Sequence, residues 1–149
     1  MGYVGCYECF KDINEENIIR PDIAADFAHK TRIDALAVAV GNSHGAYKGD
    51  AKLNFSMLNE LNTKIDVPLV MHGGSRLSRE DFRNSIQSGI SKINIATDMS
   101  SAAVERLKEE FAKASSSANY VNLMAAVKKG VKDSVRRYML NFDCISKAI

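Results

Sequence analysis

Three short apolar runs, each ending abruptly in polar or glycine residues, constrain the fold of this chain more than any other feature. They cover 33–40, 67–71 and 89–96. Near-continuous apolar runs of this length are typical of strands buried on both faces, as in parallel sheets covered by helices. The segments between the runs have the apolar spacing of amphipathic helices. The sequence therefore predicts an α/β fold in which strands and helices alternate.

Helix signals lie between and after the three runs. Pro21 and Asp22 begin a helix over 21–31, with proline in the first turn and an acidic residue near the positive helix end. Ser78 and Asp81 form a variant of the capping box and begin a helix that ends near Gly89. Further helices are predicted over about 53–64, from Asp98 or Ser100 to about 114, and over about 120–140. The residues expected on the inward faces are Ile23, Ala24, Phe27, Leu53, Phe55, Leu58, Leu61, Phe82, Ile86, Ala103, Val104, Leu107, Phe111, Leu123, Met124, Val127, Val131, Val135 and Tyr138.

Composition limits the possible function classes. The 149 residues suit one domain, 1–149, with an irregular N-terminal segment over 1–20 and a helical C-terminal segment over 119–149. A net charge of +2 gives no reason to expect nucleic acid or an anionic membrane, and the basic residues of the last helix are expected to form a solvated face. The sequence shows no apolar segment long enough to span a bilayer and no signal-peptide pattern at its start. We therefore expect a cytoplasmic protein.

The three cysteines do not suggest a disulfide framework, because their number is odd. Cys6 and Cys9 form a single C-x-x-C, for which redox and zinc-ribbon interpretations exist. The sequence has no second pair and no strand–helix context for a redox motif, so chance spacing is the favoured interpretation. Cys144 is interpreted as a small core or surface residue.

Polar residues that could carry chemistry follow the apolar runs. Parallel α/β proteins place their sites at the carboxyl ends of the strands, which is where His44 and His72 fall. His72 with Gly73, Gly74 and Ser75 could be a metal ligand beside an anion-binding loop, or a buried histidine before an ordinary turn. Similarly, Asn94, Thr97 and Asp98 could be loop or helix caps. From the residues alone, the structural interpretations are favoured.

The segments 37–48 (AVAVGNSHGAYK), 67–75 (VPLVMHGGS) and 89–98 (GISKINIATD) together closely resemble the class II, zinc-dependent ketose-bisphosphate aldolases. The order and spacing of the segments agree with that family, and the segment from Asn119 to Ala148 resembles its C-terminal helices. The resemblance implies a (β/α)8 barrel in which 33–40, 67–71 and 90–96 are the last three strands. The Asn-Ile-Ala-Thr form resembles the tagatose-bisphosphate branch more than the fructose-bisphosphate branch.

The resemblance also implies an activity and a set of site residues. The family reversibly cleaves a ketose 1,6-bisphosphate to dihydroxyacetone phosphate and glyceraldehyde 3-phosphate, and zinc acts as a Lewis acid that stabilises the enediolate charge. The implied cofactors are Zn²⁺ and a monovalent cation, and the implied zinc ligands are His44 and His72. The implied substrate-binding residues are Gly45, Gly73, Gly74, Ser75, Asn94, Ile95, Ala96 and Thr97.

The sequence departs from the family in two respects. A complete barrel needs about 250 residues, so this chain resembles its C-terminal half, without strands one to five, the first zinc histidine and the catalytic aspartate. His29 is expected on a solvated helix face, and no catalytic residue is assigned. Arg76 stands where the family has Gly or Asp, and it would strain the loop if φ is positive there, or else pair with a phosphate.

These departures leave two hypotheses for the chain. It is either an aldolase subunit that needs a complementing barrel half or a second copy to act on a phosphorylated sugar, or a catalytically inactive fragment. The inactive fragment would retain only phosphate-binding, metal-binding or interaction roles.

Overall fold

The computed structural model describes residues 5–6, 19–44, 52–114 and 119–147. The chain divides into two compact units, residues 1–95 and 96–149. Among the described helices, none is both long enough and apolar enough to cross a membrane.

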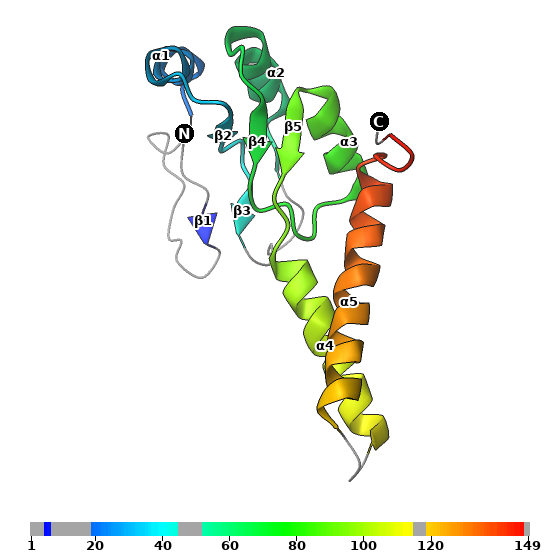
Figure 1. Ribbon diagram of the computed structural model, residues 1–149. Helices are drawn as coiled ribbons and strands as arrows, with labels where there is room; N and C mark the ends of the chain where they lie inside the picture. Colours follow the sequence, from blue (N-terminus) through cyan, green and yellow to red (C-terminus); the bar gives the residue numbers. More distant parts are fainter. Residues whose placement is uncertain (1–4, 7–18, 45–51, 115–118, 148–149) are drawn as a thin grey trace. The chain divides into compact units, whose positions relative to one another are not determined.

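The first unit contains short parallel strands (Figure 1). Three of them form a sheet in the order β2 (Leu36–Val38), β4 (Leu69–Met71), β5 (Ile90–Ile93). A separate parallel pair joins β1 (Gly5–Cys6) to β3 (Ser43–His44). The predicted parallel α/β fold is confirmed, although each strand is shorter than its apolar run. The strand β1 lies in the segment for which the sequence predicted no regular structure.

The register brings the ends of the strands to one edge. Val38 pairs with Met71, and Met71 pairs with Ile93. Because the strands are parallel, the residues that follow these three positions emerge together. A register shift between Leu69 and Val70 shows that β5 is offset by one residue near the start of its pairing with β4.

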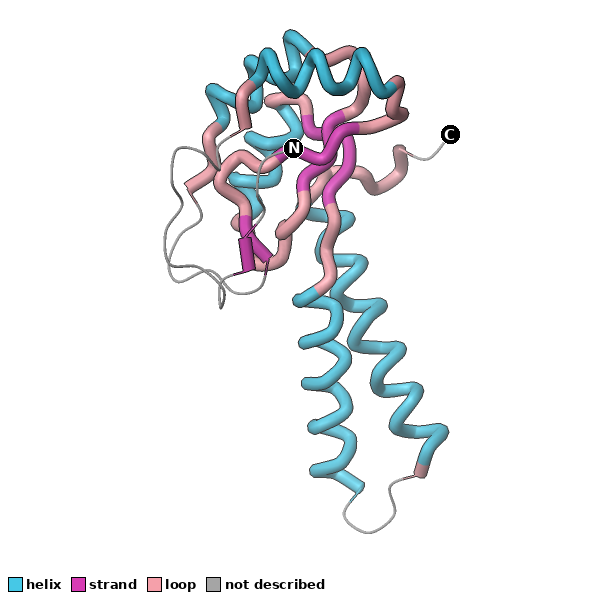
Figure 2. The backbone as a smooth tube through the Cα atoms, turned by 90° about the vertical axis from the view of Figure 1, so that its left-hand side faces the viewer, coloured by secondary structure: helices cyan, strands magenta, loops and turns pink. Residues whose placement is uncertain are grey.

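Three helices accompany these strands, and Figure 2 shows them in a second view. They are α1 (Pro21–Thr31), α2 (Phe55–Lys64) and α3 (Arg79–Gln87), of which α1 contacts α2 and α2 contacts α3. The predicted capping box is confirmed, because the Asp81 amide donates to Ser78 Oγ and the Ser78 amide donates to the Asp81 carboxylate, each at 3.0 Å. These bonds satisfy donors that the first turn of α3 cannot satisfy internally.

The core of the first unit consists mainly of aliphatic side chains from the strands and from α2, together with Phe82 of α3. The prediction for α1 was wrong for Ile23 and Phe27, which are 45% and 38% exposed, and was confirmed for Ala24, which is buried together with Ala28. Ile86 of α3 is also exposed, at 38%. A helix can pack closely through small residues, so the largest apolar side chains do not by themselves identify its inward face. The buried apolar residues of the unit are Ile19, Ala24, Ala28, Leu36, Val38, Ala39, Val40, Leu58, Leu61, Ile65, Leu69, Val70, Met71, Leu77, Phe82 and Ile90.

The second unit is a pair of long helices, α4 (Thr97–Ala114) and α5 (Tyr120–Asn141), that pack against each other. They approach each other closely at Gly130, where an added Cβ would lie 2.4 Å from the Ala102 carbonyl oxygen. Ser134, one turn further along α5, is buried as well. Small residues therefore form this part of the seam.

Three residues predicted to face inward in these helices are exposed instead. Val104 is 47% exposed, Phe111 is 52% exposed and Met124 is 42% exposed. The buried residues of α5 are instead Gly130, Ser134 and Tyr138. The predicted solvated face of α5 is confirmed, since Lys128, Lys129, Lys132, Arg136 and Arg137 are all exposed.

Candidate metal and phosphate site

The candidate site is built from the residues that follow β2, β4 and β5. His72 comes directly after Met71, the last residue of β4. Asn42 follows β2 by four residues, and Asn94 comes directly after Ile93, the last residue of β5. The parallel register accounts for their meeting at one edge, as in other α/β proteins.

His72 is half-buried and is contacted from both neighbouring strand ends. On one side, the Asn42 side-chain amide donates to the His72 backbone carbonyl at 2.8 Å. On the other side, the Asn94 side-chain nitrogen lies 3.0 Å from Nε2 and 3.3 Å from Nδ1 of the imidazole. The backbone and the ring of His72 are thus positioned by two different asparagines.

Asn94 is held by its backbone as well as by its side chain. Its amide donates to the Met71 carbonyl at 2.9 Å, and its own carbonyl accepts from the Gly74 amide at 3.3 Å. Its side-chain oxygen accepts a hydrogen bond from Lys92 Nζ. Since Lys92 is a donor only, this bond directs the side-chain NH2 of Asn94 toward His72. Asn94 therefore links β4, the glycine loop and the imidazole.

The tautomer of His72 decides what the ring can bind. The Asn94 amide can donate only to a ring nitrogen that carries no proton, and neutral imidazole has one such nitrogen. A metal ion requires the same kind of lone pair. A metal on His72 would consequently bind with the other nitrogen deprotonated or after the Asn94 amide has turned away.

The glycine loop lies against the end of β5. Gly73 has a φ of +65°, which a residue with a Cβ adopts only with strain. A Cβ added to Gly74 would lie 2.7 Å from the side-chain methyl carbons of Ile93 and Ile95, closer than such atoms approach. The Gly74 amide donates to the Asn94 carbonyl and so has a structural partner. Of this loop, Ser75 is buried at 3% exposure.

Arg76 has a φ of +67° and is exposed. The sequence predicted strain at Arg76 if its φ is positive, and the structure places Arg76 in the left-handed region. This conformation costs an L-residue roughly 1–2 kcal/mol. The loop that would hold phosphate therefore carries local backbone strain at Arg76.

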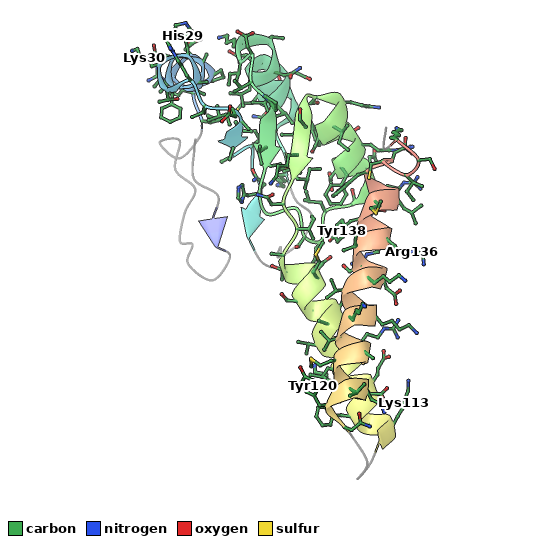
Figure 3. The ribbon with its side chains drawn as sticks, in the orientation of Figure 1. His29, Lys30, Lys113, Tyr120, Arg136 and Tyr138 are labelled. Atoms are coloured by element: carbon green, nitrogen blue, oxygen red, sulfur yellow. The ribbon has the colours of Figure 1, made fainter. Side chains whose placement is uncertain are left out.

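The other predicted site residues are placed only in part. His44 is the last residue of β3, but its side chain and the whole of Gly45 lie outside the described residues. Ile95 is half-buried, Ala96 is exposed and Thr97 is the first residue of α4. His29 is exposed on α1, as expected (Figure 3). Cys144 is a free, exposed cysteine, and Cys9 lies outside the described residues.

The donors here are of a type that zinc prefers, but they form only part of a ligand set. Neutral imidazole is a good zinc ligand, and catalytic zinc usually has three protein ligands. In the part of the chain that the structure describes, no three His, Cys, Asp or Glu side chains are gathered closely enough to hold a metal ion. His72 fits the role of one ligand, and further ligands must come from side chains beyond those described.

Asn42 and Lys92 are two residues of this edge to which the sequence assigned no role. Asn42 is 4% exposed, and its side chain bridges parts of the chain that are far apart in sequence. The available signal was a polar residue directly after Gly41 at the end of an apolar run. Lys92 alternates with apolar residues along β5 and looks like an ordinary exposed strand residue.

Comparisons with known proteins agree with this geometry. The family model described as "Fructose-bisphosphate aldolase class-II" matches residues 1–147. The Escherichia coli (strain K12) protein YdjI, named as uncharacterized, is 38% identical over 149 residues, which are 99% of this chain and 52% of that protein. The chain thus spans about half the length of this relative.

Solved structures show the same fold. The crystal structure of the YdjI aldolase from Escherichia coli K12 superposes with a TM-score of 0.76 at 34% identity, covering 88% of this chain and 47% of that one. The fructose-bisphosphate aldolase of Campylobacter jejuni gives a TM-score of 0.71 at 21% identity, covering 93% of this chain and 50% of that one.

Parallel strands with helices between them, and polar loops at the carboxyl edge of the strands, define part of a (β/α)8-barrel protein of the aldolase type. The chain belongs to the class II fructose-bisphosphate aldolase family.

Proposed function

We propose that this chain contributes to a class II aldolase that reversibly cleaves a ketose 1,6-bisphosphate, tagatose or fructose, to dihydroxyacetone phosphate and glyceraldehyde 3-phosphate. The proposal includes Zn²⁺ and a monovalent cation as cofactors and a cytoplasmic setting. A second copy or a complementing barrel half is the proposed protein partner. Family membership and the arrangement around His72 support it.

The observation that carries the proposal is the position of His72 between Asn42 and Asn94 at the carboxyl edge of β4. A histidine that serves only as core filling needs no such arrangement. Here the backbone carbonyl is fixed at 2.8 Å and the ring has an amide 3.0 Å from Nε2. Hydrogen bonds behind a metal-binding histidine set its orientation, and the Asn42 bond to the His72 carbonyl is of this kind. His72 is therefore the residue on which we base the metal site.

In this proposal, His44 at the end of β3 and His72 after β4 would hold zinc. When bound, zinc would supply Lewis-acid stabilisation of the negative charge that develops as the carbon–carbon bond breaks. Asn94 would turn its amide away from the ring nitrogen that binds the metal, and it would contact the substrate. No described residue is proposed as the proton donor, so that group must come from a complementing segment.

The phosphate of the substrate would lie at the loop after β4. Phosphate sites in these barrels commonly form from the loops after the last two strands. The proposed binding residues are those of the two loops that Gly74 and Asn94 join through their backbone. They are Gly73, Gly74, Ser75, Asn94, Ile95, Ala96 and Thr97, and Gly45, which follows His44 in the sequence, completes the proposed set.

A complementation assay tests this function. The chain would be co-expressed with the N-terminal half of a full-length relative such as YdjI, and cleavage of fructose and tagatose 1,6-bisphosphate would be measured with zinc and with a chelator. We expect zinc-dependent cleavage. His72→Ala should reduce it by more than the roughly 10–100-fold typical of outer-shell changes, because a ligand itself is lost.

His29→Ala is the matched control, since His29 is exposed on α1. It should leave the cleavage rate unchanged. A folded complex that cleaves neither sugar, at any zinc concentration, would contradict the proposal. That result would favour the second hypothesis, in which the chain is a catalytically inactive fragment.

A further inference from the structure

Asn42 is a buried side chain with both ends engaged. It is 4% exposed. Its Oδ1 accepts from the Val40 amide at 2.7 Å, and its Nδ2 donates to the His72 carbonyl at 2.8 Å. Burying a carboxamide is costly unless it is hydrogen-bonded, so the close fit at both ends is required for Asn42 to lie here.

The position of Asn42 along the chain gives this bridge its significance. The β2–β4 ladder extends to Val38 and Met71. Beyond Val38 the chain leaves its pairing with β4. The next strand, β3 (Ser43–His44), pairs with β1 instead of β4. The Asn42 side chain provides a link between the two diverging strand ends, across 30 residues of sequence.

The backbone around Asn42 has little freedom to adjust. The Val40 carbonyl accepts from the Asn54 amide at 2.8 Å, so Val40 is bonded at both its N–H and its C=O. Gly41 has a φ of +95°, and a Cβ there would lie 2.3 Å from the Lys52 carbonyl oxygen. The turn that carries Asn42 is therefore fixed from both sides, and a change at Asn42 would be transmitted to its two neighbours along the chain.

We propose that Asn42 is a positioning residue for the metal site, which sets the backbone of His72 relative to the segment that leads into His44. The inference rests on the proposed function. Two histidine ligands must keep a fixed separation to bind one ion, and hydrogen bonds behind the ligands usually provide it. The Asn42 side chain makes this link between the two strand ends.

The test is Co²⁺ titration of the chain combined with its complementing half, followed by visible absorption, in wild type, Asn42→Asp and Asn42→Ala. Asp keeps the acceptor for Val40 N–H but places a carboxylate oxygen against the His72 carbonyl. Ala removes both bonds. We expect each variant to bind Co²⁺ about 10–100-fold more weakly and to shift the absorption bands that report ligand geometry.

Asn119→Ala is the matched control. Asn119 caps α5 by accepting from the Asn122 amide at 3.0 Å, so its loss should lower stability without a change in the Co²⁺ spectrum or affinity. Thermal unfolding of every variant separates the two effects. Wild-type affinity and an unchanged spectrum in Asn42→Asp would overturn the inference.

Two further measurements keep the test decisive. If the Asn42 variants do not fold, a second measurement takes their place. It is the rate at which the side-chain amide protons of wild-type Asn42 exchange with solvent, with and without Zn²⁺. Slower exchange with Zn²⁺ supports the inference, and unchanged exchange overturns it.

His72→Ala distinguishes the two proposals. If this variant binds Co²⁺ as well as wild type does, or if wild type binds none, the proposed metal site is wrong and the role of Asn42 is wrong with it. If His72→Ala abolishes binding and Asn42→Asp does not weaken it, only the role of Asn42 fails.

Discussion

The Tyr138 hydroxyl donates a hydrogen bond to the Asp98 carboxylate at 2.5 Å, which joins the end of α5 to the first turn of α4. Tyr138 is buried, and its side chain lies on the side of α5 that faces α4, opposite Arg136 (Figure 3). The Arg137 guanidinium also reaches the same Asp98 oxygen at 3.4 Å and lies 5.4 Å from the centre of the Tyr138 ring. Asp98 therefore connects the first turn of α4 to the last turns of α5 through two side chains.

Tyr138→Phe tests how much the hydrogen bond between Tyr138 and Asp98 contributes to stability. The substitution keeps the buried ring but removes a hydrogen bond to a charged group, which is worth about 1.5–3 kcal/mol. We expect the free energy of unfolding to fall by about that amount in denaturant titration. Tyr120→Phe is the control, because Tyr120 is 75% exposed. Equal stability of the two variants would show that the Asp98 contact contributes nothing.

Gly130→Ala should reverse the usual effect of removing a helical glycine. In the interior of a helix, Gly is normally about 0.5–1 kcal/mol less favourable than Ala. At Gly130, however, the new Cβ would lie 2.4 Å from the Ala102 carbonyl oxygen, a backbone atom that cannot move independently of α4. We expect a net loss of about 1–3 kcal/mol, as for overpacked cores. Lys132→Ala, at an exposed position on the same helix, should change stability by less than about 0.5 kcal/mol.

Arg76→Gly should stabilise the chain by up to about 1 kcal/mol, because glycine accepts a positive φ without the Cβ clash that strains arginine. The observed φ of +67° is the basis for this expectation. Arg83→Gly is the contrasting control: Arg83 is exposed within α3, where glycine should cost about 1 kcal/mol. Inorganic phosphate binding should be unchanged in Arg76→Gly, and weaker binding would instead assign Arg76 to the phosphate.

Lys64 of α2 forms an ion pair with Asp22 of α1, and this contact should be visible in the pKa of Lys64. Hydrogen bonds to Asp22, at 2.6 Å, and to Glu60 raise the pKa of Lys64 to about 12, from an ordinary value of 10.5. The same contact with Lys64 lowers the pKa of the Asp22 carboxyl below 3.8. We expect Asp22→Asn to lower the Lys64 pKa in an NMR titration. Asp26→Asn, which removes the partner of Lys30, should leave the Lys64 pKa unchanged.

The sign of the pH effect follows from these two directions. A lysine whose pKa is raised on folding contributes stability below 10.5 that is lost as the pH rises through about 12. A carboxyl whose pKa is lowered contributes stability above 3.8 that is lost as the pH falls through its folded pKa. Both groups are exposed, so the effect should diminish with salt. Salt-independent stability would show that the pair is not significant.

Local signals carried much of the fold. The three apolar runs predicted parallel strands, and the spacing of Ser78 and Asp81 predicted a capping box that the structure has. These features depend on the nearest few residues, so the sequence alone is sufficient for them. The helix faces were less predictable, since Ala28 and Gly130 are buried where larger neighbours on the same helices are exposed. A spacing pattern cannot show how near a second helix will come.

The sequence by itself determined where the polar residues stand: directly after strands, with His72 before two glycines and Asn94 after the third run. Only the tertiary structure decided how they meet. The Asn42 bridge to His72 spans 30 residues and exists because two parallel strands diverge beyond Val38 and Met71. The left-handed conformation of Arg76 likewise depends on the loop that surrounds it. Hydrogen bonds between distant segments follow from strand register, which no local pattern specifies.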